Sequence, residues 1–229
     1  MGNKLNIENL DLRTEQERVS AEKKTESRTV EVDSSIKTYS DDGGSYRPFV
    51  HLHLHTFHSI LDGCGSVDNY VKLAKEYNHP AMAITDHGTL SGLFEFQKKC
   101  KRGGIKPILG VEAYVNDSGG DDGSKGYERG NAHQILLIMN KQGFVNANYL
   151  AYRSFAEGFY YKPRMRTDWI IEKSEGLFAT TACMGNTVAK LFFKNSPQEA
   201  ERYFLKLRDA FGENFASEIH LNELKDQYY

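Results

Sequence analysis

The sequence predicts an α/β fold. From residue 48 onward, short apolar runs rich in β-branched residues alternate with longer segments of helical period. The chain has 229 residues, of which 39% are hydrophobic, so it is long enough to bury a core. The alternation favours a sheet of mainly parallel strands that are joined through helices.

Six segments are predicted to be strands and six to be helices. The strands are placed at 49–54, 81–85, 106–115, 133–139, 177–182 and 216–221. The helices are placed at 66–77, 90–101, 143–157, 167–172, 186–194 and 197–211, the last with Ser196 as N-cap and Pro197 at its first position. A Gly- and Asp-rich stretch, 116–131, is predicted to be a surface loop, and 158–166 a connection broken by proline.

Residues 1–47 are predicted to form a flexible tail. They are charged, rich in hydroxyl groups and poor in aromatic residues, so they can bury little apolar surface. A short helix over 7–24 is the alternative, but its apolar stripe is thin. The folded domain is therefore expected to occupy residues 48–229.

Charge and cysteine content exclude several classes of protein. The 29 basic and 31 acidic residues leave a net charge of -2, so no overall basic field attracts nucleic acid, and any such contact must be local. Three scattered cysteines do not make a disulfide framework, which favours a reducing, cytoplasmic compartment. No run approaches the roughly 18 to 20 apolar residues that span a bilayer, and the first residues do not resemble a signal peptide. We therefore expect neither export nor a membrane.

The strongest functional signal is the segment 51–63, HLHLHTFHSILDG. If 49–54 is a strand, alternate side chains share a face, so His51, His53 and His55 would point to the same side. Neutral imidazoles suit zinc, manganese or iron, and Asp62 adds an oxygen ligand that could reach a second ion. A histidine-rich surface strand without metal is the alternative.

Four further candidates lie in or next to predicted strands. His87 follows a strand in the segment ITDHG, and Glu112 lies in an otherwise apolar strand, where an unpaired carboxylate would be costly. His133 begins a strand and Cys183 directly follows one. Taken singly, His87 could be a loop residue and Cys183 a small buried hydrophobe. Because strand ends meet at one edge of a sheet, their joint placement predicts a shared metal site.

The chain resembles the polymerase-and-histidinol-phosphatase (PHP) domain at the N-terminus of the catalytic alpha subunit of bacterial, C-family, DNA polymerase III. The resemblance runs from about residue 49 to the end and is carried by HLHLHTFHSILDG, ITDHGTLSGLFEF, IKPILGVEAYV, GFYYKPR and GLFATTACMG, in the family's order. It implies a distorted (β/α)7 barrel, of which about six βα units are present. It also implies up to three divalent ions, zinc, manganese or iron, in a cleft at the carboxyl edge of the strands.

The family pattern implies a set of metal ligands, with Glu112 bridging two ions. These ligands are His53, His55, Asp62, His87, Glu112, His133 and Cys183. His51 is then a near neighbour, and His58, where the family usually has an aromatic residue, is at most a contact of the ligands. The family's last two ligands, in an Asn-Asp-x-His segment, have no counterpart. We therefore expect a barrel that is incomplete at its C-terminus, with a full ligand set only around Glu112, His133 and Cys183.

The resemblance implies metal-dependent phosphoester hydrolysis, which in polymerases takes the form of a 3′–5′ exonuclease in DNA replication. In the GFYYKPR segment, which favours the polymerase branch, Lys162 and Arg164 would contact phosphates, or else form a solvated basic loop. The alternatives are a non-catalytic domain that supports a polymerase core and a stand-alone phosphatase of small molecules. Expected partners are DNA, as a 3′ end or single strand, and a second polypeptide that completes the barrel.

Overall fold

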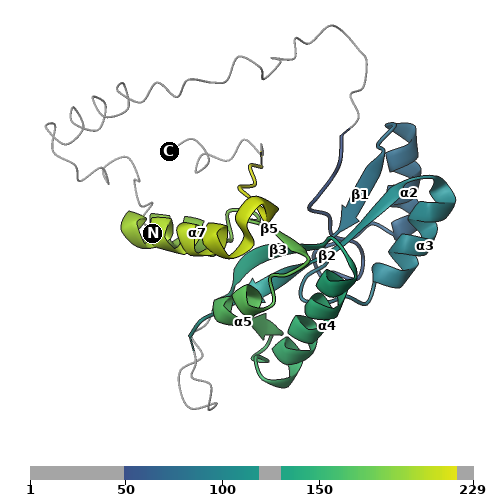
Figure 1. The fold of residues 1–229 in the computed structure, drawn as a ribbon. Helices are drawn as coiled ribbons and strands as arrows, with labels where there is room; N and C mark the ends of the chain where they lie inside the picture. The colour runs from purple at the N-terminus through teal and green to yellow at the C-terminus, as the bar shows by residue number, and fades with distance from the viewer. Residues whose placement is uncertain (1–48, 119–129, 221–229) are drawn as a thin grey trace, which may run out of the picture. The chain divides into compact units, whose positions relative to one another are not determined.

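The computed structural model describes residues 49–118 and 130–220 and confirms the α/β fold (Figure 1). The strands are β1 (Ala81–Ile84), β2 (Lys106–Val115), β3 (Ala132–Ile138), β4 (Arg164–Met165), β5 (Leu177–Thr180) and β6 (Phe215–Ala216). The helices are α2 (Val67–Glu76), α3 (Leu93–Gly103), α4 (Lys141–Ala156), α5 (Thr167–Glu172), α6 (Thr187–Phe193) and α7 (Pro197–Phe211), followed by the 3-10 turn η2 (Gly212–Asn214). The predicted tail, 1–47, and most of the predicted loop 116–131 lie outside the described residues.

The sheet is mixed, so the expectation of mainly parallel strands is only partly right. Its order is β1-β2-β3-β5-β6, and the short β4 pairs with β2. The pairs β1–β2 and β5–β6 are parallel, whereas β3 is antiparallel to both β2 and β5. The sequence between β2 and β3 is Gly- and Asp-rich without helical period, whereas a parallel pair usually requires a helix in its crossover, so the sequence of this connection favours the antiparallel pairing.

The prediction of a strand at 49–54 is wrong. In this segment His51 makes one bridge to Met82, and the backbone carbonyls of His51 and Leu54 accept from Ala83 N and Thr85 N. The backbone N–H of Leu54, however, donates to the hydroxyl of Thr85 at 2.8 Å instead of to a strand carbonyl. The span from His51 to Leu54 is thus paired with the shorter span from Ala83 to Thr85, so the pairing is irregular and no regular strand forms.

The helix predictions are confirmed, with boundaries that differ by up to three residues. Ser66 and Asn186 cap α2 and α6 by accepting a backbone N–H through their side chains. Pro197 is the first residue of α7, as predicted, although Ser196 makes no side-chain cap there. β4 was not predicted, because it is two residues long and lies inside the Pro-broken connection. β6 is shorter than the predicted 216–221.

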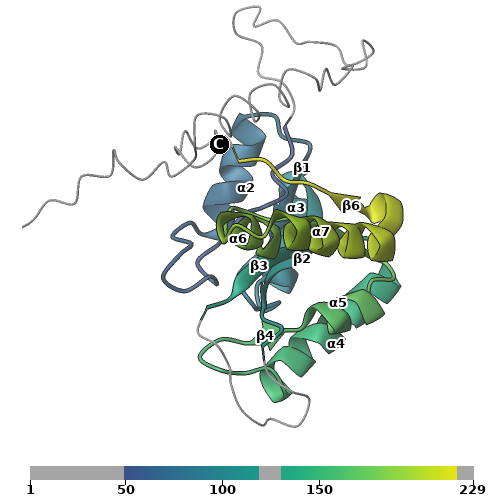
Figure 2. The same cartoon turned by 90° about the vertical axis from the view of Figure 1, so that its left-hand side faces the viewer.

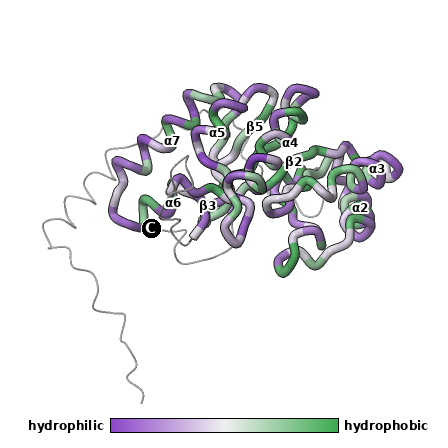
Figure 3. Tube along the Cα trace, turned by 90° about the horizontal axis from the view of Figure 1, so that it is seen from below, coloured by the Kyte–Doolittle hydropathy of each residue, from purple (hydrophilic) through white to green (hydrophobic). Residues whose placement is uncertain are grey.

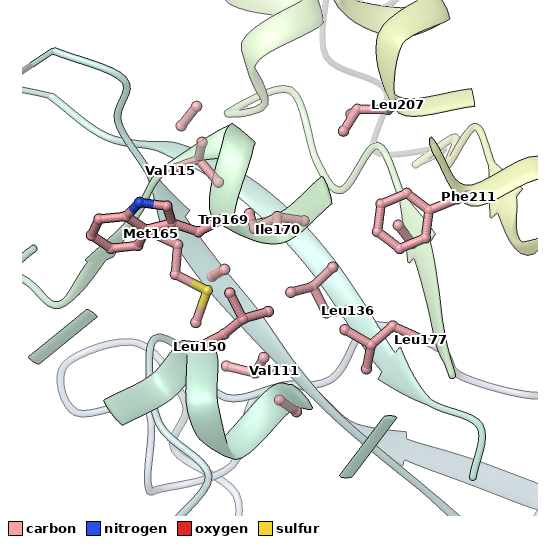
Figure 4. Close-up of a cluster of buried hydrophobic side chains, with 14 residues drawn as sticks. Val111, Val115, Leu136, Leu150, Met165, Trp169, Ile170, Leu177, Leu207 and Phe211 are labelled. Atoms are coloured by element: carbon pink, nitrogen blue, oxygen red, sulfur yellow. The ribbon is translucent and has the colours of Figure 1, made fainter. Parts of the chain in front are cut away.

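Helices α2, α3, α4, α5 and α7 pack on one face of the sheet. In β2, Val111, Ala113 and Val115 belong to the main core, in which Leu150 of α4 and Leu207 of α7 are also buried (Figure 4). A second cluster joins α2 and α3 to β1. Figure 2 shows α6 and α7 next to each other, and Figure 3 shows hydrophilic segments along α3 and α7. Since side chains alternate along a strand, Glu112 must lie on the opposite face of β2.

None of the helices within the described ranges has the length and apolar character needed to cross a membrane.

The start of α4 packs directly on the turn at Gly176, and this contact predicts whether a substitution at Gly143 stabilises or destabilises the fold. A Cβ at Gly143 would lie 1.8 Å from the carbonyl oxygen of Gly176. Helix propensity favours alanine by about 1 kcal/mol, whereas overpacking costs about 1–3 kcal/mol or more. We expect Gly143→Ala to lower the free energy of unfolding, measured in urea, by about 2 kcal/mol. Val145→Ala, an exposed position of the same helix, should change it by less than about 0.5 kcal/mol. A stabilised Gly143→Ala protein would contradict the packing.

Candidate metal centre

The strand directions bring the predicted ligands to one edge of the sheet. Because β3 runs opposite to β1, β2, β5 and β6, its start meets the ends of the other four. His87 follows β1, Glu112 lies near the end of β2, and His133 is at the start of β3. Cys183 follows β5. The segment before α2 adds the remaining three candidates, His53, His55 and Asp62.

Glu112 is the hub of the cluster, and its side chain is 1% exposed. One carboxylate oxygen, Oε1, lies 3.0 Å from His133 Nδ1 and 3.4 Å from His53 Nε2. The other, Oε2, lies 3.0 Å from His55 Nε2 and 2.8 Å from His87 Nδ1. Each oxygen therefore faces a separate pair of imidazoles, an arrangement suited to a carboxylate shared between ions.

The other contacts join these imidazoles to each other and to Asp62. The Nε2 atoms of His53 and His55 are 3.1 Å apart, and the rings of His55 and His87 stack with centroids 4.2 Å apart. Asp62 Oδ2 lies 3.1 Å from His87 Nε2 and 3.8 Å from His55 Nδ1. Ligand atoms within 4.8 Å of one another occur around Glu112 and Asp62 in three groups: His53, His55 and Glu112; His55, Asp62 and His87; and His87, Glu112 and His133.

Cys183 lies beside the third of these groups. Its Sγ is 3.5 Å from His133 Nδ1 and 3.9 Å from Glu112 Oε1, and it accepts the backbone N–H of Gly185. The contact with His133 lowers the pKa of the Cys183 thiol, against the effect of burial. The preceding residue, Ala182, has a φ of 57°, in the left-handed region that costs a non-glycine residue roughly 1–2 kcal/mol. The strained backbone at Ala182 thus coincides with the turn that directs the thiol to His133.

The residues of the cluster fit a divalent metal ion. Glu112 Oε2 and His87 Nδ1 are both buried and 2.8 Å apart, yet within the described ranges neither has a hydrogen-bond partner of acceptable geometry. Buried polar atoms without partners are rare in native proteins. Imidazole nitrogens, carboxylate oxygens and one thiol are the donors that zinc, manganese and iron accept.

Without a metal, protonated imidazoles balance the charge of Glu112. Burial lowers the pKa of His53, but the contacts with Glu112 and Glu218 outweigh it and raise the pKa to about 10. The contacts of His133 with Cys183 and Glu112 raise the pKa of that imidazole to about 9. Burial raises the pKa of Glu112, but the contacts with His133 and His53 hold it far below its usual range. A metal ion must therefore displace protons from this cluster.

Asp86, which the sequence analysis did not single out, fixes the loop that carries His55. Its buried carboxylate accepts from Thr56 N at 2.6 Å, from the Thr56 hydroxyl at 2.8 Å and from the Ser59 hydroxyl at 2.9 Å. Ser59 Oγ in turn accepts the backbone N–H of His87 and lies 3.0 Å from His55 Nδ1. The signal for Asp86 was its place directly before His87 in an apolar segment.

Glu218 and His220, which follow β6, were also missed. Glu218 Oε1 lies 2.7 Å from His53 Nδ1, and the same carboxylate contacts His220 Nε2 and the hydroxyl of Thr180. Once a metal ion displaces the second proton of His53, an imidazole that donates from Nδ1 has its lone pair on Nε2, and in His53 this atom faces Glu112 and His55. Glu218 and His220 stand two positions apart in a predicted strand, so their shared face was readable from the sequence.

His51 does not share a face with His53 and His55, and this expectation is corrected. Its ring lies against Phe49 and His79, with centroids 4.7 and 5.2 Å apart. The cause is the missing regular strand at 49–54, which removes the alternation of side chains.

The remaining candidates lie outside the cluster of ligands. His58 Nε2 is 3.4 Å from Glu95, and Lys162 Nζ lies 5.4 Å from the centre of the Tyr114 ring. Arg164 is 3% exposed, and its Nε donates to the carbonyl of Gly158. Arg164 thus holds the connection between α4 and β4, a position that does not fit the expected contact with phosphate.

Comparisons with known proteins agree with the sequence pattern. The family model described as "PHP domain" matches residues 51–222. DNA polymerase III subunit alpha of Borreliella burgdorferi is 38% identical over 185 residues, covering 78% of this chain and 16% of the relative. The same subunit of Aquifex aeolicus is 39% identical over 187 residues, covering 79% of this chain and 16% of the relative. The chain thus spans about one sixth of the length of these relatives.

Two solved structures are similar at a lower level. One is an amidohydrolase from Chromobacterium violaceum with bound sulfate and no metal, with a TM-score of 0.33, 22% identity, and coverage of 45% of this chain and 34% of that chain. The other is a proposed metal-dependent phosphoesterase from Bifidobacterium adolescentis, with a TM-score of 0.29 and 17% identity. The match covers 77% of this chain and 56% of that chain. Both TM-scores are too low to support a conclusion.

The pKa shifts predict how stability of the metal-free protein depends on pH. The pKa values of His53 and His133 are higher in the folded protein than the ordinary value of 6.5. Their contribution to the free energy of unfolding is therefore complete below pH 6.5. It is lost as pH rises through their folded values of about 9 and 10. We expect the free energy of unfolding of chelator-treated protein to fall from neutral to alkaline pH. Zinc-loaded protein, in which metal replaces these protons, should not show this fall; equal pH profiles would contradict the assignment.

Glu218 offers a test of the hydrogen bond to His53. Loss of such an outer partner typically weakens metal binding about 10- to 100-fold, so we expect Glu218→Gln to do so in a competition titration with a chelator. His58→Ala, which removes an imidazole outside the cluster, should leave the affinity unchanged. Equal affinities of the two variants would show that the contact with Glu218 does not orient His53.

Proposed function

The chain belongs to the PHP domain family, and from this membership we propose that the cluster around Glu112 binds divalent metal ions and hydrolyses phosphoesters. One observation carries the proposal. A buried carboxylate has four imidazoles within 3.4 Å, and two of the buried polar atoms have no hydrogen-bond partner among the described residues. An arrangement of this kind is costly unless a cation completes it.

The ligands would be the seven candidates that the sequence indicated. They are His53, His55, Asp62, His87, Glu112, His133 and Cys183. Bound ions of this kind lower the pKa of a coordinated water toward about 7 and stabilise the charge that develops on a phosphate. The three groups of ligand atoms around Glu112 and Asp62 support a capacity of up to three ions, zinc, manganese or iron.

Other residues of the chain would supply charge, position the ligands and contact the phosphate. Glu112 would supply a negative charge shared by two of the groups of ligand atoms, because the contacts with His133 and His53 keep its carboxylate ionised. Asp86 holds the loop with His55, and Glu218 fixes the proton of His53 on Nδ1. Lys162, exposed beside Tyr114, supplies a cation for a phosphate group.

The proposed substrate is DNA, attacked from its 3′ end, within a polymerase that replicates DNA. This finer statement is supported by the identity with polymerase subunits over nearly four fifths of the chain. A stand-alone phosphatase of small molecules is less consistent with that identity. Access to DNA would come through the wider polymerase, of which this chain spans a small part.

A structural role within such a polymerase is the second candidate. It is favoured by an apolar hollow of about 580 Å³ between the starts of α3 and α4, lined by Phe94, Met139 and Phe144. The Phe94 side chain is 76% exposed. A surface of this kind suits burial against another part of a larger protein.

The two candidates differ in what Glu112 does. We expect Glu112→Gln to lose most of its metal by elemental analysis, and hydrolysis of a phosphodiester with added manganese or zinc to fall by more than about 100-fold. The control is His51→Ala, because His51 lies outside the cluster; its metal content and activity should match those of the unchanged protein.

Wild-type protein that holds metal but hydrolyses no phosphoester would favour the structural role. Equal metal content in Glu112→Gln and His51→Ala would reject the metal site itself.

A further inference from the structure

A second hollow, of about 460 Å³, adjoins the metal cluster through His87. We call it the aromatic pocket, defined by Phe57, His87, Tyr114, Phe155, Lys162 and Pro163. Its volume lies within the range of about 300–1,000 Å³ that is usual for small-molecule sites. The only member of this set that also belongs to the metal cluster is His87, so the pocket opens beside the proposed reaction centre.

The wall next to the cluster is an ordered stack. The rings of His87 and Tyr114 are nearly parallel, at 12° with centroids 5.2 Å apart, and Lys162 Nζ lies 5.4 Å from the Tyr114 centroid. Gly88, at a φ of 62°, lets the chain pass close to Pro163, because a Cβ at this position would lie only 2.8 Å from the Pro163 side chain.

The lining also includes two phenyl rings that are partly exposed to solvent. Phe57 is 44% exposed and stacks on His58, and Phe155 is 54% exposed and stacks on Phe159. Large apolar groups that remain exposed beside a proposed reaction centre are suited to stacking with a planar ring. The pocket therefore combines aromatic surfaces with one cation, Lys162, at the side of the metal ligands.

We propose that the aromatic pocket receives the base and sugar of the terminal nucleotide of a single-stranded polynucleotide. The base stacks on Phe57 and Phe155, and Lys162 contacts the adjoining phosphate. This inference rests on the proposed function, since the scissile phosphodiester must lie at the cluster. A phosphate alone would use the metal and Lys162 but not the phenyl rings, and an apolar ligand would not use Lys162. A terminal nucleotide uses both.

The test compares two probes that differ by one base. The first is a short single-stranded oligothymidylate, and the second is the same strand with an abasic 3′-terminal residue. Binding to metal-loaded protein is measured by fluorescence anisotropy. We expect the complete strand to bind at least about fivefold more tightly.

Three variants test whether the preference for the complete strand over the abasic strand depends on the aromatic pocket. Phe57→Ala and Phe155→Ala should each bring the affinity for the complete strand towards that for the abasic strand, and Lys162→Ala should weaken both probes and reduce the salt dependence. The matched control is Phe94→Ala, an exposed phenylalanine that lines the other hollow; it should keep the full preference.

The outcomes separate this inference from the proposed function. The proposed role of the aromatic pocket would be overturned by equal affinity of the wild-type protein for the two probes. It would also be overturned by a preference that persists in both phenylalanine variants. Hydrolysis of the abasic strand in that case would leave the proposed function standing. A base preference that depends on Phe57 and Phe155 in a protein that hydrolyses neither strand would support the pocket and overturn the hydrolase.

Discussion

A carboxylate that is almost completely buried must be balanced by opposite charge, and the position of Glu112 sets where the other polar groups of this domain can lie. The chain meets this requirement with imidazoles from three separate parts of the sequence, among them His53, His87 and His133. The direction of β3 is consistent with the same demand. If β3 ran parallel to β2, His133 would lie at the far edge of the sheet, and one of the two oxygens of Glu112 would lose its closest contact.

The strand β2 serves the core and the candidate site at once. Val111, Ala113 and Val115 face the helices, whereas Glu112 and Tyr114 face the other way. Each side of the strand therefore constrains the other, because a shift of register by one residue would place a carboxylate among the helices and a valine among the imidazoles. The core and the cluster specify the same register.

The sequence was sufficient for features that depend on local pattern and insufficient for those that depend on hydrogen bonds between distant residues. Helical period placed α2, helical period together with Pro197 placed α7, and the run of valine, leucine and isoleucine around Glu112 placed β2. The failure at 49–54 comes from an irregular pairing with 83–85, where Leu54 N–H donates to the hydroxyl of Thr85, 31 residues away. For the same reason His51 was placed beside the cluster. Asp86 and Glu218 stand at positions that the sequence marks, but their contacts with Ser59 and His53 join residues 27 and 165 positions apart, and these contacts become visible only in the fold.

The short loop between Thr56 and Ser59 has a consequence for how the site responds to ligands. Asp86 anchors this loop at both ends, so Phe57, which lines the aromatic pocket, and His55, which faces Glu112, are carried by the same anchored segment. A ligand that contacts one of these side chains would therefore also act on the loop that carries the other. If the proposed metal and nucleotide both bind, any effect of the first on the affinity for the second must equal the effect of the second on the affinity for the first.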